Sequence, residues 1–145
     1  MSDKLKRMTG LFQVCYQNGK EMPGAPLLKL NLGVYTPEET VSGIGHITQA
    51  TRPPLNIGVR LHGHYTYMCV MPRNCHILVT ATGYALTRWP LHGGIGPVLP
   101  PTFEMRMVLT EDWKSGTANF KYTDAKGRWH EIKDAPVKQV PCNTI

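Results

Sequence analysis

Two histidines spaced one residue apart are the sharpest chemical feature of the sequence. His62 and His64 flank Gly63 in a run that alternates apolar and polar residues, so on a strand both imidazoles would point to one face. Paired imidazoles can bind zinc or iron if a neighbouring strand supplies a third ligand, for which His46 is the nearest candidate. Arg60 would share that face and repel a cation. A solvated polar face is therefore the first interpretation, and a metal-dependent enzyme using His62 and His64 is an alternative.

The remaining reactive residue types form no complete catalytic set. Cys75 precedes His76, but adjacent strand residues point to opposite faces, so this pair cannot act as nucleophile and base. The acidic pair Glu38-Glu39 falls in a predicted turn, and no phosphate-binding glycine loop or nucleophile elbow occurs. We expect a protein that is not an enzyme and that uses no cofactor or metal.

Strands are the elements that must position these side chains. Apolar and polar residues alternate over much of the chain, and its 14 glycines and 12 prolines cluster between the apolar runs. The predicted strands span residues 11–17, 27–35, 41–50, 56–70, 76–86, 103–109, 117–122 and 128–132, with 133–145 as a short strand or a loose arm. Short connections favour an antiparallel meander.

The expected fold class is all-β, a predominantly antiparallel meander of about eight strands that forms a twisted sheet, a sandwich or a barrel. The alternative is an α+β fold with a twisted antiparallel sheet and short terminal helices. In either case the apolar phase of the strands should be buried. Its members are Leu28, Leu30, Leu32, Val59, Leu61, Ile77, Val79, Met105 and Met107.

Length and charge narrow the domain organisation and the partners. The chain has 145 residues, which suits a flexible basic N-terminal arm at 1–10 and a single β-rich domain at 11–145. The net charge of +6 is scattered, so nucleic acid is not an expected partner. No apolar run approaches the roughly 20 residues of a membrane span, and no apolar segment follows the basic start. We expect a cytoplasmic protein, or one exported without a Sec signal peptide.

The four cysteines are widely spread and contain no CxxC pair. Free, largely buried thiols in a reducing compartment are the favoured interpretation. If the protein is exported, Cys15 and Cys142 are the pair to test for a disulfide, since both lie near the ends of the ordered region.

Candidate contact residues lie in a long irregular segment and at one hairpin tip. Residues 88–102 exceed what a hairpin needs, and long loops of this kind are often functional. Exposed aromatic groups there would suit a protein or ligand contact, although the segment could equally cap one end of the sheet. The predicted binding residues are Trp89, His92, Gly93, Gly94 and, at the hairpin tip, Trp113.

One curved sheet of this length buries too little apolar area by itself, so we expect a homo-oligomer, either a trimer or a dimer. The leading function class is a non-enzymatic protein-interaction or assembly module. A small-ligand carrier with a pocket inside a β-barrel is the second class, and the metal-dependent enzyme is the third.

Several runs carry a resemblance to a known family. They are residues 41–51, 53–57, 62–68 and 107–119. Together they resemble a small uncharacterised family of Gram-negative bacterial proteins, a domain of unknown function, over about residues 10–142. The family is similar to pathogenicity-island proteins related in fold to the mitochondrial matrix glycoprotein that binds the first complement component. The resemblance implies a twisted antiparallel sheet assembled as a ring-like trimer, a link to virulence and a host protein partner such as complement.

Overall fold

The computed structural model of the protein describes residues 10–18, 25–50, 54–70, 74–86, 100–124 and 126–142. The predicted basic arm, apart from Gly10, lies outside these residues. Strands dominate the described chain: β1 (Leu11–Asn18), β2 (Leu27–Tyr35), β3 (Thr40–Gln49), β4 (Leu55–Val70), β5 (Asn74–Ala85), β6 (Phe103–Thr110), β7 (Ser115–Thr123) and β8 (Trp129–Val140). The predicted all-β class is confirmed.

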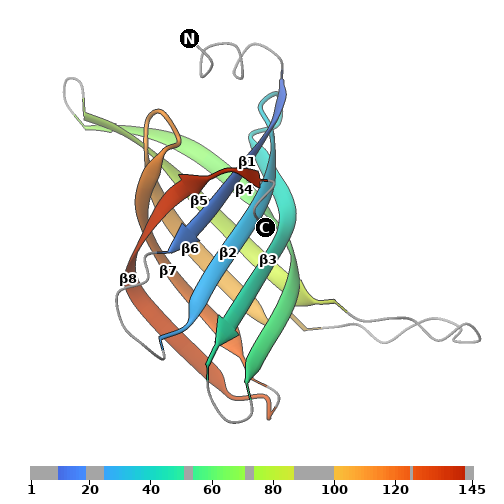
Figure 1. Cartoon of the computed structure of the whole chain (residues 1–145). Helices are drawn as coiled ribbons and strands as arrows, with labels where there is room; N and C mark the ends of the chain where they lie inside the picture. The colour runs from blue at the N-terminus through green and yellow to red at the C-terminus, as the bar shows by residue number, and fades with distance from the viewer. Residues whose placement is uncertain are drawn as a thin grey trace, which may run out of the picture.

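The strands pair antiparallel in chain order and close into a barrel, with β8 returning to β1 (Figure 1). Among the three predicted shapes the barrel is therefore correct, and the open twisted sheet implied by the glycoprotein resemblance is wrong. The closing strand was largely missed, since β8 continues to Val140 where a short strand or a loose arm was expected. The pairing of β1 with β8 that closes the barrel, here called the seam, is short: residues 15–18 of β1 pair with residues 137–140 of β8.

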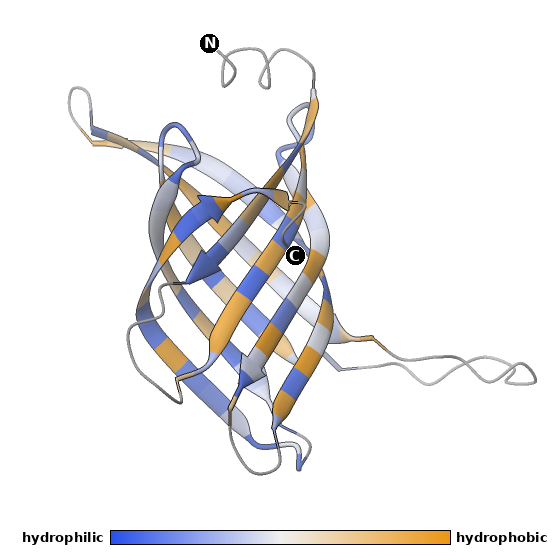
Figure 2. Cartoon of the chain, in the orientation of Figure 1, coloured by the Kyte–Doolittle hydropathy of each residue, from blue (hydrophilic) through white to orange (hydrophobic). Residues whose placement is uncertain are grey.

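Apolar side chains fill the barrel interior because each strand points every second residue inward. Figure 2 shows the resulting bands of hydrophobic and hydrophilic residues along the strands. All nine residues predicted for the core are buried, and they belong to one apolar cluster. Tyr16, Phe103 and Phe120 are the largest fully buried side chains in that cluster. The interior of this small barrel is thus occupied by side chains, as expected for eight strands.

Trp113, which the sequence predicted as a contact residue at a hairpin tip, closes one end of the barrel. Its side chain is only 4% exposed, and its ring meets Phe12 edge-on at 5.3 Å and Tyr65 at 5.1 Å between centroids. The backbone of Trp113 has φ 67°, which turns the residue from the β6–β7 connection back over the core. A side chain covered in this way offers no exposed contact to a partner.

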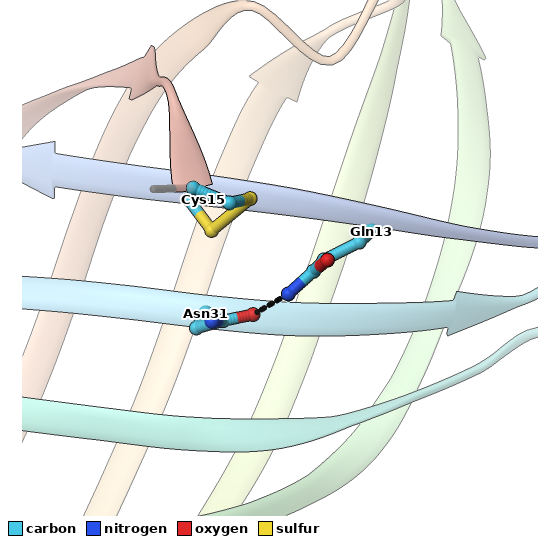
Figure 3. Close-up of a disulfide and its surroundings, with 4 residues drawn as sticks. Gln13, Cys15 and Asn31 are labelled. Carbon is cyan, nitrogen blue, oxygen red and sulfur yellow. Dashed lines mark hydrogen bonds between the residues drawn. A yellow bond between two sulfur atoms is a disulfide. The ribbon is translucent and has the colours of Figure 1, made fainter. Parts of the chain in front are cut away.

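The cysteines form two disulfides, Cys15–Cys142 and Cys69–Cys75, so the expectation of free thiols is wrong. Cys15 shares the outward phase of β1 with Gln13, yet it is fully buried where it bonds Cys142. Figure 3 shows this disulfide beside the hydrogen bond from Gln13 Nε2 to Asn31 Oδ1 (2.6 Å). The first disulfide pins the segment after β8 onto β1, next to the short seam.

Closure of the sheet removes the reason given for an oligomer. The predicted association rested on an open sheet with an uncovered apolar face, whereas the barrel buries that face by itself. Any association must therefore use the outer surface or a free strand edge. Within the described ranges, no helix has the length and apolar character needed to span a membrane.

Candidate functional site

A trough of about 780 Å³ lies on the outer face of β4 to β8. Most of the residues that line it are the outward-pointing residues of these strands, and the inward residues Ala81, Met105 and Phe120 also border it. Its ionisable side chains include His62, His64, Glu104, Arg106, Lys121 and Glu131. Both histidines singled out from the sequence therefore lie in this trough.

Strand register arranges the trough in two rows that run across the barrel. In the first row, His64 on β4 is opposite Thr80 on β5, Thr80 is opposite Arg106 on β6, and Arg106 is opposite Asn119 on β7. Residues directly opposite on one face have Cβ atoms about 4.5–5.5 Å apart, so neighbouring side chains of a row can act on one bound group.

The second row lies two residues along each strand and has a different charge pattern. Lys121 on β7 is opposite Glu104 on one side and Glu131 on the other. Acidic residues are therefore the register neighbours of Lys121 on both sides. Arg106 in the first row has only the neutral partners Thr80 and Asn119 directly across from it.

Ion pairs in the described part of the chain leave Arg106 without a carboxylate partner. The pairs are His130–Asp124 at 2.8 Å and Lys133–Glu131 at 3.8 Å. A guanidinium offers five N–H donors in a planar fork that matches a carboxylate or a phosphate. The first row therefore presents an unneutralised cation between two neutral side chains that can hydrogen-bond.

A bulge in β8, where Lys133 and Asp134 together oppose Asn119, fixes the end of this row. Pairing between β7 and β8 shifts register between Ala118 and Phe120, and the backbone N–H of Asp134 donates to Asn119 Oδ1 at 2.7 Å. Asp134 takes φ 56° there. Because the amide oxygen of Asn119 is used in this way, its NH₂ group is the part left to donate toward the trough.

The two histidines lie on one face as predicted, but the proposed third ligand does not join them. The rings of His62 and His64 are 6.0 Å apart between centroids and meet edge-on. His46 is opposite Gly58, whereas His62 is opposite Ser42 four residues along β3, so the suggestion that His46 completes a site is wrong. Among the described residues no group of three or more His, Cys, Asp or Glu is placed to hold a metal ion.

Gly63 keeps β4 close to β5 between these histidines. A Cβ atom at this position would overlap the carbonyl oxygen of Thr80 across the pair. The absence of a side chain thus allows the strand to curve tightly at the trough, which is a common role of glycine inside barrel strands.

The binding residues predicted from the long segment cannot be placed. Trp89, His92, Gly93 and Gly94 lie outside the described residues. No sequence pattern singled out the first row around Arg106, hereafter the polar row. Its members are the polar phase of ordinary strands, and their convergence depends on the register between four strands.

The β7–β8 turn carries the most perturbed carboxyl group of the described chain. Asp124 accepts a hydrogen bond from His130 at 2.8 Å and from the backbone N–H groups of Lys126 and Arg128 at 2.9 and 3.0 Å. The His130 contact is the largest cause, and together these bonds lower the pKa of the Asp124 carboxyl from 3.8 to about 2. The effect stabilises a turn and lies beside the trough, not in the polar row.

Comparison with known proteins identifies one family. Residues 9–129 match a family described as a domain of unknown function, DUF1842. The matched region ends where β8 begins. No curated protein matches the chain significantly.

Proposed function

Because this chain belongs to the DUF1842 family, a domain of unknown function, we propose a role from its surface: a non-enzymatic protein-interaction module that binds an acidic segment of a partner in the outer trough. The packed interior favours the outer wall over the barrel lumen as the contact surface. The trough is large enough for several side chains of a bound peptide.

The observation that carries this proposal is the unneutralised guanidinium of Arg106. Thr80 and Asn119 flank it in the register, and His64 lies one strand further on. A carboxylate bound to Arg106 could accept hydrogen bonds from the same row.

A short peptide with a central pair of glutamates tests the proposal, with the same peptide carrying glutamines as the probe control. Calorimetry should detect the acidic peptide, and Arg106→Gln should weaken its binding by about tenfold or more, because hydrogen bonds to charged groups contribute roughly 1.5–3 kcal/mol. Arg60→Gln is the matched protein control. Arg60 is exposed on the outer face of β4 and lies outside the trough. Equal affinity for both peptides would exclude an acidic segment as the ligand.

The resemblance in sequence supports three further parts of the proposal: bacterial origin, a link to virulence and a host protein partner. The globular heads of the first complement component are the first host protein to test, by surface plasmon resonance with Arg106→Gln as the control. The two disulfides support the exported alternative for localisation, since disulfides persist in oxidising compartments. We also keep the proposal that the protein is a homo-oligomer, now on the basis of its outer surface.

Two other functions stay as alternatives. A small-ligand carrier would have to use the outer trough, and an acidic small molecule such as citrate is the probe to compare with the peptide. A metal-dependent enzyme would need His62 and His64 with ligands from elsewhere. One zinc or iron per purified chain that is lost in His62→Ala would replace the interaction proposal with this one.

A further inference from the structure

The hairpin of β4 and β5 extends past the end of the barrel as a two-stranded arm. Figure 1 shows it at the upper left, where the light green and yellow-green strands leave the wall together. Residues 66–70 of β4 are all exposed, although residues 59–65 of the same strand alternate between buried and exposed positions. Cys69 is opposite Cys75 and bonded to it, so a disulfide joins the two strands of the arm.

One edge of this arm is open. β3 begins at Thr40, which is opposite His64, and the last contact across this edge is the hydrogen bond from Tyr65 N–H to the Glu39 carbonyl oxygen (3.0 Å). Beyond that point no strand of the described chain pairs with the outer edge of β4. Backbone groups two and four residues further on point the same way as those of Tyr65, so the N–H and C=O groups of Tyr67 and Cys69 face outward.

The side chains of the arm lack the features that usually protect an open edge. Natural edge strands are commonly blocked by lysine, proline or a bulge. Residues 65–70 contain none of these and no charged residue, in a chain of net charge +6. Met68 is 37% exposed and Val70 is 69% exposed, so apolar surface accompanies the unpaired backbone groups.

We propose that the β4 edge of this arm is a dimerisation site and that its occupant is the same edge of a second copy of the chain. This inference rests on the homo-oligomer of the proposed function and names its interface and its stoichiometry. An uncharged edge favours a second copy over an acidic or basic partner, because two otherwise basic molecules can meet there without opposing like charges.

The edge is self-complementary in an antiparallel, two-fold arrangement. With the axis at Met68, Tyr67 of each copy is opposite Cys69 of the other, and both pairs exchange N–H and C=O groups. Met68 then faces Met68 of the second copy, and Thr66 faces Val70, which places apolar atoms together on one face. The arms overlap in opposite directions, so each barrel lies at the far end of the other arm.

A charge at the axis tests this interface. Wild-type protein should have the mass of a dimer by size-exclusion chromatography with light scattering. Met68→Lys should reduce it to a monomer, because two ammonium groups would face each other directly. Val108→Lys is the matched control: Val108 is 38% exposed, but β6 is paired on both sides and has no open edge there. Val108→Lys should therefore remain a dimer.

A cross-link gives a second, independent readout. Directly opposed residues of a non-hydrogen-bonded antiparallel pair have Cα atoms about 4.5 Å apart, within the roughly 4.4–6.8 Å range of disulfides. Mild oxidation of Met68→Cys should give a covalent dimer whose 68–68 bond is found by mass spectrometry, and Val108→Cys should not. An oligomer that Met68→Lys leaves intact would overturn the arm interface while keeping the homo-oligomer. A wild-type monomer at every concentration tested would overturn both, while peptide binding in the trough would still be measured separately.

Discussion

The hydroxyl of Tyr16 on β1 donates a hydrogen bond of 2.6 Å to the carbonyl oxygen of Trp113, a residue 97 positions away. Both residues are buried. This bond ties the first strand to the β6–β7 connection and satisfies a backbone carbonyl inside the apolar end of the barrel. A buried carbonyl without such a partner would be costly.

Removal of this hydroxyl should destabilise the protein more than removal of an exposed one. Tyr16→Phe leaves the Trp113 carbonyl unpaired in the core, and we expect a loss of about 1–3 kcal/mol in the free energy of unfolding. Tyr35→Phe is the control, because Tyr35 is exposed and its change should cost less than about 0.5 kcal/mol. Urea denaturation followed by fluorescence measures both. Equal stability of the two variants would mean that the bond contributes nothing net.

The packed interior predicts a large penalty for a cavity. Leu30 is fully buried in the core cluster, and Leu30→Ala should lower the free energy of unfolding by about 2–5 kcal/mol. Leu11→Ala makes the same chemical change at a site that is 64% exposed, so it should have little effect. Thermal unfolding monitored by circular dichroism compares the two. A small effect at Leu30 would indicate a loosely packed barrel with room for a ligand.

The two disulfides should contribute unequally to stability. Cys15–Cys142 closes a loop with a sequence separation of 127, and Cys69–Cys75 closes one of 6. The chain-entropy relation then gives about 5 kcal/mol for the first and about 2 kcal/mol for the second. Denaturation of the Cys15→Ala/Cys142→Ala and Cys69→Ala/Cys75→Ala variants measures the difference. Equal losses would show that the effect of the first disulfide is local, without a role in holding the seam.

The carboxyl group of Asp124 should titrate at unusually low pH. Its pKa in the folded protein is about 2, lowered from 3.8, chiefly by the hydrogen bond from His130. The folded state therefore binds its proton less readily than the unfolded chain. The resulting stabilisation is complete above about pH 4 and is lost as the pH falls through about 2.

Carbon-detected NMR of the Asp124 carboxyl gives this midpoint directly. His130→Ala should raise the midpoint toward 3.8, because it removes the largest cause of the shift. His76→Ala removes a histidine on β5 and should leave the midpoint unchanged. A midpoint near 3.8 in the wild-type protein would contradict the bonded geometry of this turn.

The core was predicted well because the alternation of apolar and polar residues within one strand already shows which of its side chains point inward. Leu28, Leu61 and Met107 were assigned from alternation alone, and that assignment needs no knowledge of neighbouring strands. The end of β8 was harder to predict. Asp134, Pro136 and Lys138 are its exposed phase, and the small Ala135 gives a weak inward signal.

The features that were missed depend on contacts between distant segments. Trp113 is buried only because Phe12 and Tyr65 meet it at the mouth of a closed barrel. The polar row around Arg106 exists only once four strands adopt one register. Neither condition can be read from spacing along a single strand, so the sequence pointed to exposed aromatics instead.

The short seam between β1 and β8 has a consequence for the order of folding. Residues 15–18 of β1 pair with residues 137–140 of β8. The outer edge of β1 is therefore covered only after β8, the last strand, has been synthesised. During synthesis, β2 to β7 can each pair with the preceding strand as they emerge, while the outer edge of β1 stays open to other chains. Pairing two strands that lie more than 100 residues apart in the sequence has a high entropic cost and is slow. The open edge of β1 is therefore exposed to aggregation for longer. The rate at which nascent chains seal their seam should therefore limit the yield of soluble protein.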